Sequence, residues 1–252
     1  MSIRGLKRIK IVNISSNDKE VSVKVYSFKM EQLLIAFFGL VIAGAMIVGL
    51  RAEYVETFAM PVSRKVVVLD AGHGGWDPGK VGDKEVLEKD INLEIALKLQ
   101  AMLEQGGATV LMTRIEDEAL GKGKQSDMRA RGTIASTTNA DVIISIHQNS
   151  YPSEKVTGTQ VFFYEGSERS RRLAELIQQE VKHFLGQITN REAKPDNNYY
   201  ILKQTSIPAV IVECGFLSSP AETRLLVDGE YQERMAWAIY KGILEYFNNS
   251  DI

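Results

Sequence analysis

Short, mostly apolar runs, separated by longer segments with helical periodicity, dominate the chain from residue 64 onward. The runs cover residues 66–69, 109–112, 142–146, 159–164 and 209–212. Several of them are apolar at every position, which is typical of strands that are covered on both faces of a sheet. The pattern therefore predicts a short β-strand at each run.

The segments between these runs carry apolar residues at helical spacing. The first such repeat consists of Ile91, Ile95, Leu99 and Met102. Asp90 precedes it as the expected N-cap, and Gly106 with Gly107 is the expected stop. Further helices are expected over residues 127–138, 170–184 and 230–247. This alternation predicts an α/β fold, a three-layer sandwich with a central, mostly parallel or mixed sheet flanked by helices, in one domain over residues 64–250.

An uncharged, almost wholly apolar segment of 18 residues lies near the N-terminus, over residues 33–50. As a helix it would reach about 27 Å, which is enough to cross the hydrocarbon core of a membrane. The segment before Met30 holds seven Lys or Arg and two acidic residues, a net charge of 7 minus 2, or plus 5, and such flanks stay in the cytoplasm. We predict a cytoplasmic segment over residues 1–31, a single transmembrane helix over residues 32–50 and a linker over residues 51–63, with the following domain outside the cytoplasm.

A cleaved signal peptide is the alternative to this anchor. The basic region of a signal peptide is normally short, and no small-x-small cleavage site follows Leu50 at the expected distance. The sequence therefore favours an anchor that is not cleaved.

Composition excludes several classes of site. The chain has one cysteine, Cys214, which excludes an intramolecular disulfide framework and a structural zinc site built from several thiolates. The sequence pI of about 6.0 shows no basic face that would favour nucleic acid, so we expect no nucleic-acid partner.

Chemically capable side chains follow three of the predicted strands. His73 lies in the glycine-rich turn after residues 66–69, His147 directly follows residues 142–146, and Glu213 directly follows residues 209–212. In an open α/β sheet, ligands bind beyond the carboxyl ends of the strands. A carboxylate in a buried strand is costly unless its charge is paired or meets a metal. The pattern indicates a metal site at one edge of the sheet.

A catalytic zinc site has three protein ligands and an open position for water, so two histidines need a carboxylate beside them. Glu85, Glu88 and Asp90 all lie where a returning loop would present one, and spacing alone does not choose between them. Zinc lowers the pKa of bound water towards about 7, and Glu213 would suit the role of proton acceptor and donor. These residues predict metal-assisted hydrolysis of an amide or similar bond.

Other candidate residues have plain structural explanations. His183 lies in a helical pattern, and we assign it to packing or to the surface. Cys214 follows the strand-end glutamate, and because adjacent strand residues face opposite sides it should face the packing layer. Asp70 either orients a ligand histidine or forms the turn. The pair Tyr199 and Tyr200 either lines a sugar or peptide groove or belongs to the core.

Five segments, in this order and at similar spacing, resemble the zinc-dependent N-acetylmuramoyl-L-alanine amidases of bacterial cell walls. They are VVVLDAGHGG, LEKDINLEIA, LMTR, VIISIHQNS and IPAVIVECGFLSSPAE, and the resemblance covers residues 64–248. It implies that His73, Glu88 and His147 bind Zn²⁺, that Glu213 is the catalytic glutamate, and that the substrate is peptidoglycan.

The chain departs from the family pattern in two places and agrees with it in others. Ala71 stands where proline is common, and Cys214 stands where valine or isoleucine is usual; neither change removes a ligand. Asn149, Arg114 and Arg131 fall where the family keeps these residue types, and we assign them no catalytic role. The stretch between the second histidine and the glutamate has no room for the inserted helix that blocks the site in some relatives.

The segment NNYYILKQTSIPAVIVECGFLS looks most like the sporulation branch, which trims spore-cortex peptidoglycan for germination. Together with the predicted membrane anchor, the resemblance implies a single-pass membrane amidase that faces the cell wall or spore cortex. One alternative is a membrane-tethered wall-binding or scaffold protein that has the amidase fold and needs an activating protein partner. Another is a zinc peptidase or deacetylase that acts on a different wall bond.

Overall fold

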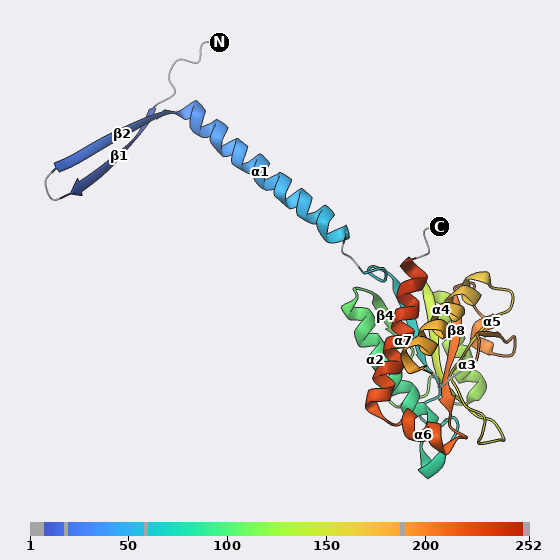
Figure 1. Cartoon of the computed structure of the whole chain (residues 1–252). Helices are drawn as coiled ribbons and strands as arrows, with labels where there is room; N and C mark the ends of the chain where they lie inside the picture. Colours follow the sequence, from blue (N-terminus) through green and yellow to red (C-terminus); the bar gives the residue numbers. More distant parts are fainter. Residues whose placement is uncertain (1–7, 18–19, 58–59, 187–189, 249–252) are drawn as a thin grey trace. The chain divides into compact units, whose positions relative to one another are not determined.

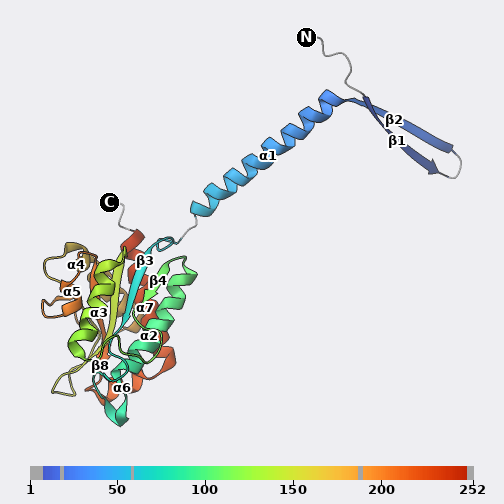
Figure 2. The ribbon, with the colours of Figure 1, turned by 180° about the vertical axis from the view of Figure 1, so that it is seen from behind.

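The computed structural model describes residues 8–17, 20–57, 60–186 and 190–248, with side chains described over residues 32–46 and from residue 60 onward. The chain divides into two compact units, Met1–Phe58 and Ala59–Ile252. Figures 1 and 2 show the elements of both units from opposite sides.

The N-terminal unit consists of a β-hairpin followed by one helix. Strands β1 (Arg8–Asn17) and β2 (Glu20–Lys29) pair antiparallel, and α1 (Met30–Thr57) follows directly. The helix contains the apolar run and continues through residues 51–57, which we had predicted as linker.

No helix in the described part of the chain is both long and apolar enough to span a bilayer. The side chains of residues 47–50, at the end of the predicted span, lie outside those described. The transmembrane anchor therefore stays a prediction.

The second unit is built on a mixed sheet of six strands in the order β4-β3-β5-β8-β6-β7. The strands are β3 (Val66–Ala71), β4 (Thr109–Met112), β5 (Val142–Asn149), β6 (Gln160–Phe163), β7 (Lys194–Pro195) and β8 (Ala209–Phe216). Neighbours from β4 to β8 pair parallel, and β6 pairs antiparallel with β8. The predicted mixed sheet is confirmed.

Helices cover both faces of the sheet, as the three-layer prediction requires. The helices are α2 (Glu88–Gln105), α3 (Lys124–Thr137), α4 (Glu168–Leu185), α5 (Tyr200–Lys203), α6 (Pro220–Leu226) and α7 (Gly229–Asn248), with a 3-10 turn η1 (Asp83–Glu85) before α2. The larger apolar core lies between the sheet and α2, α4 and α7, and a smaller core lies under α3 and α5. Figure 1 shows α2 and α7 on the near side of the sheet, and Figure 2 shows α3 on the opposite side.

Strand alternation determines which polar residues share a face of the sheet. In β3, Val67 and Leu69 belong to the larger core, whereas Val68 belongs to the smaller one. The same alternation places Ile143 in β5 and Ile211 in β8 in the smaller core. Because side chains two positions apart share a face, the residues that continue these three rows also face the α3 side. They are Asp70, Ser145, His147 and Glu213.

The predicted start of α2 is wrong by three residues, because the expected N-cap was Asp90 and the observed N-cap is Leu87. The helix begins at Glu88 with Leu87 as its N-cap, and Asp90 lies in its first turn. The reason is local: the chain before the helix is already held by a bridge between Val81 and Leu87, and the Glu88 amide donates to the Lys80 carbonyl at 2.9 Å. The early start places the Glu88 side chain at the helix end that faces the strand edge.

Candidate metal centre and active site

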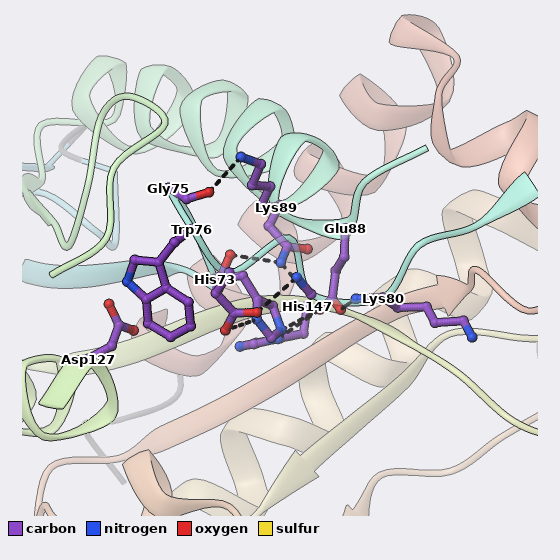
Figure 3. A network of polar contacts seen from close by, with 12 residues as sticks. His73, Gly75, Trp76, Lys80, Glu88, Lys89, Asp127 and His147 are labelled. Carbon is purple, nitrogen blue, oxygen red and sulfur yellow. Dashed lines mark hydrogen bonds and ion pairs between the residues drawn. The ribbon is translucent and has the colours of Figure 1, made fainter. Parts of the chain in front are cut away.

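Three potential metal ligands converge at the carboxyl edge of the sheet (Figure 3). His73 comes from the turn after β3, Glu88 is the first residue of α2, and His147 comes from β5. Their ligand atoms all lie within 4.8 Å of one another. Glu88 Oε1 is 3.2 Å from His73 Nε2 and 3.0 Å from His147 Nδ1. Donors around a tetrahedral zinc are about 3.3 Å apart, given metal–ligand bonds of about 2.0 Å, so the cluster fits such an ion.

The structure distinguishes among the three carboxylates that spacing had left open. Glu88 is buried within the cluster, whereas Glu85 and Asp90 are exposed. Glu88 Oε2 accepts the Lys80 amide at 2.8 Å, and Oε1 accepts the Gln148 amide at 3.1 Å. Burial raises the pKa of Glu88, but hydrogen bonds and charge from the two histidines outweigh it and hold that pKa well below its usual range. Glu88 is therefore an ionised carboxylate, the form a metal requires.

The turn that carries His73 has a strained backbone and a dedicated carboxylate. His73 has φ 61°, in the left-handed region, and Gly74 and Gly75 follow with φ 133° and 56°. The Asp77 carboxylate lies 2.8 Å from His73 Nδ1, which leaves Nε2 to face Glu88. Burial lowers the pKa of His73, but Glu88 and Asp77 outweigh it and raise the pKa to about 9. An orienting carboxylate of this kind is typical of histidines that bind metals.

Two glycines allow the ligands to approach the backbone closely. A Cβ at Gly72 would lie 2.2 Å from Cε1 of His147, and one at Gly79 would lie 2.6 Å from Oε2 of Glu88. Gly79 also has φ +68°. Glycine at these positions is therefore a steric requirement of the cluster.

Two buried arginines hold the backbone of the turn that carries His73. Arg114 donates to the carbonyls of Ala71 and Gly72 at 2.8 and 3.1 Å. Arg131 donates to the His73 carbonyl at 2.6 Å and to Asp70 Oδ1, also at 2.6 Å. Both arginines therefore stabilise the conformation of this turn.

Replacing Arg131 by Met is expected to lower the free energy of unfolding by about 3–5 kcal/mol, because Asp70 would lose its buried ion-pair partner. Urea denaturation followed by circular dichroism would measure the change. Arg171→Met is the control: Arg171 pairs with Glu168 and Glu175 on the exposed face of α4, and its loss should change stability little. Equal effects of the two substitutions would contradict the structural role of Arg131.

Asp70 does not orient a ligand histidine. It is buried, and beyond Arg131 it accepts hydrogen bonds from Thr113 at 2.9 Å and Ser145 at 2.6 Å. Asp77 has the orienting position instead. Sequence reasoning did not identify Asp77, and the available signal was its place four residues after His73 in a tight turn.

Glu213 lies beside the cluster in a separate, buried environment. It pairs in register with His147 across β8 and β5, and only 6% of its surface is exposed. Its Oε1 accepts a hydrogen bond from the Tyr199 hydroxyl at 3.0 Å, and its Oε2 is buried with no hydrogen-bond partner in the described part of the protein. Burial raises the pKa of Glu213, which favours exchange of a proton at this carboxylate.

The remaining candidates make contacts outside the ligand cluster. Cys214 is fully buried in the larger core, on the opposite face from Glu213, and burial raises the pKa of its thiol. His183 is in α4, with its ring 4.8 Å from that of Phe184. The Asn149 side chain accepts the Ser150 amide at 2.8 Å. The contacts of these three side chains give no support for a role in hydrolysis.

A cavity of about 130 Å³ adjoins the ligand cluster. Its walls include His73 and His147, Lys124 and Met128 of α3, and the pair Tyr199 and Tyr200. The tyrosine pair therefore lines this cavity, and Tyr199 also packs against the smaller core. This arrangement provides room for a substrate group beside the clustered ligands and the buried carboxylate.

Comparison with known sequences gives one family. The family model for N-acetylmuramoyl-L-alanine amidases matches residues 67–245. The germination-specific N-acetylmuramoyl-L-alanine amidase of Bacillus subtilis (strain 168) is 40% identical over 200 residues, which are 76% of this chain and 84% of that protein. The probable cell wall amidase LytH of Staphylococcus aureus is 33% identical over 194 residues, which are 75% of this chain and 60% of that protein.

Solved structures agree with this result. The CwlD amidase from Clostridioides difficile, in complex with the GerS lipoprotein, matches with a TM-score of 0.71 and 41% identity over 73% of this chain and 99% of that chain. The catalytic domain of the CwlV amidase from Bacillus (Paenibacillus) polymyxa var. colistinus matches with a TM-score of 0.66 and 34% identity, over 73% of this chain and 98% of that chain. With a family model that spans most of the folded unit and relatives of this similarity, the chain belongs to the N-acetylmuramoyl-L-alanine amidase family.

Proposed function

We propose that this amidase is zinc-dependent, that His73, Glu88 and His147 hold the ion, and that Glu213 is its proton carrier. The observation that carries the proposal is the convergence of two imidazoles and a carboxylate within 4.8 Å, next to a buried glutamate, one oxygen of which has no hydrogen-bond partner among the described residues. The donor set of nitrogen and oxygen suits a catalytic zinc, for which three protein ligands are usual.

The reaction is hydrolysis of the amide bond between the lactyl group of N-acetylmuramic acid and L-alanine. Zinc at this site would polarise the carbonyl and lower the pKa of a water molecule. Glu213 accepts a proton from the attacking water and passes it to the nitrogen of L-alanine. The water oxygen bonds to the carbonyl carbon, the carbon–nitrogen bond breaks, and the products are a lactyl carboxylate and a peptide with a free amine.

The biological setting follows from the relatives and is part of the proposal. A germination-specific amidase at 40% identity supports action on spore-cortex peptidoglycan. The complex of the CwlD amidase with the GerS lipoprotein supports an activating or positioning protein partner for this chain also. The apolar run over residues 33–50 supports a membrane anchor, with the catalytic unit facing the wall or cortex.

Metal content and product mass, measured on one preparation of the full-length protein, test the proposed reaction. We expect about one zinc per chain, release of stem peptides with a free L-alanine amine from defined muropeptides, and loss of this activity with a chelator. Readdition of zinc should restore it. Activity that persists without metal would overturn the mechanism.

The same product masses separate the alternatives. A deacetylase would release acetate and leave the stem peptide attached, whereas a peptidase would cut within the peptide. Zinc binding without any hydrolysis, with or without added partner protein, would support the scaffold interpretation.

A further inference from the structure

The two carboxylate oxygens of Glu213 have different surroundings. Oε1 accepts the Tyr199 hydroxyl at 3.0 Å, whereas the buried Oε2 has no hydrogen-bond partner among the described residues. A hydrogen bond to one oxygen orients the carboxylate and makes that oxygen less available to a proton. The asymmetry therefore distinguishes Oε2 as the free oxygen.

Packing around Tyr199 holds its hydroxyl in place. Its ring lies 5.5 Å from the ring of Phe162, a buried residue of β6, at an interplanar angle of 50°. Just before it, the amide of Asp196 donates to the Phe163 carbonyl at 2.9 Å, which ties the segment to the end of β6. Both contacts connect Tyr199 and the segment before it to β6.

Tyr199 keeps its proton in this environment. Burial raises its pKa, and the nearby charge of Glu213 raises the pKa further. A protonated phenol next to a carboxylate has one role in the pair, since it donates and the carboxylate accepts. The donor also favours the ionised form of Glu213, in opposition to the effect of burial.

On the basis of the proposed function of Glu213, we propose that Tyr199 is a positioning residue. Its hydroxyl holds Oε1 of Glu213, so that Oε2 takes the proton from the attacking water and delivers it to the leaving nitrogen. Tyr199 acts through the glutamate and has no contact of its own with the reacting atoms.

Tyr199→Phe tests this role in the full-length, zinc-loaded protein, because it keeps the ring and removes only the hydroxyl. We expect kcat on a defined muropeptide to fall about 10-fold or more, as for the loss of a hydrogen bond to a charged group. KM and zinc content should stay the same. Tyr240→Phe is the matched control: Tyr240 is buried in α7, on the other side of the sheet, and this variant should keep kcat within about 2-fold. A Tyr199→Phe protein with unchanged kcat would overturn the inference.

A second measurement separates positioning from substrate contact. Affinity for the muropeptide is measured in Glu213→Gln and in Glu213→Gln with Tyr199→Phe, where hydrolysis is blocked. Equal affinities support positioning, whereas weaker binding in the double variant, or loss of zinc from either Tyr199 variant, overturns it. If Glu213→Gln alone retains full activity, the proposed function itself is wrong. If Glu213→Gln is inactive and Tyr199→Phe is fully active, only the Tyr199 inference fails.

Discussion

Replacing Glu213 by Gln is expected to lower kcat by about 10²- to 10⁴-fold while the protein retains its zinc. Glutamine has nearly the same shape and still offers an oxygen to the Tyr199 hydroxyl, so the fold and the ligand cluster should persist. An amide cannot accept and return the proton that the reaction moves. Steady-state kinetics with zinc analysis of the same sample gives both quantities.

Glu222→Gln is the matched control for this experiment. Glu222 is also a buried glutamate, and its carboxylate accepts the amides of Gly158 and Phe216 at 2.9 and 2.8 Å, away from the ligand cluster. The control should lose stability and keep kcat within about 2-fold. Full activity of Glu213→Gln would exclude Glu213 as the proton carrier, and an unchanged cellular phenotype in an inactive variant would favour the scaffold interpretation.

Replacing Gly72 by Ala is expected to abolish zinc binding and hydrolysis, although no ligand is changed. The new Cβ would lie 2.2 Å from Cε1 and 2.3 Å from Nε2 of His147, distances that van der Waals contact does not allow. The backbone of His147 is fixed in a central strand of the sheet. Either the His147 ring must therefore rotate out of the cluster, or the turn after β3 that contains Gly72 must move. Zinc per chain and kcat should both fall to background.

Gly123→Ala is the control for the loss of glycine itself. Gly123 precedes α3, and a Cβ there meets no atom within 4 Å. This variant should retain zinc and activity. A Gly72→Ala protein that is folded by circular dichroism and still binds zinc stoichiometrically would refute the close-approach argument.

The strand positions and the ligand histidines could be predicted because their signals are local. An apolar run in β3 followed by a glycine turn predicts both a strand and a side chain presented at its end, and the apolar run in β5 likewise leads directly to His147. Glu213 could be recognised because a carboxylate in a fully buried strand is costly unless its charge is paired or meets a metal. In each case one short segment contains the whole pattern.

The residues that were missed depend on contacts between distant segments. Nothing in the sequence around Tyr199 shows that its hydroxyl meets Glu213, 14 residues later. The start of α2 was misplaced because a β-bridge, not a capping side chain, determines it. Likewise, the position of Asp70 just before a glycine-rich turn is typical of a turn-forming residue. Only the fold reveals its pairing with Arg131, 61 residues away.

The register between β5 and β8 has an evolutionary consequence. His147 and Glu213 are direct neighbours across two central, parallel strands, so backbone hydrogen bonding determines the spacing between a proposed ligand and the proposed proton carrier. Part of the wall of the adjoining cavity comes instead from Lys124 and Met128 of α3 and from Tyr200, the first residue of α5. Descendants of this chain can therefore acquire new preferences for wall fragments through changes at Lys124, Met128 and Tyr200, while the spacing of His147 and Glu213 is inherited intact.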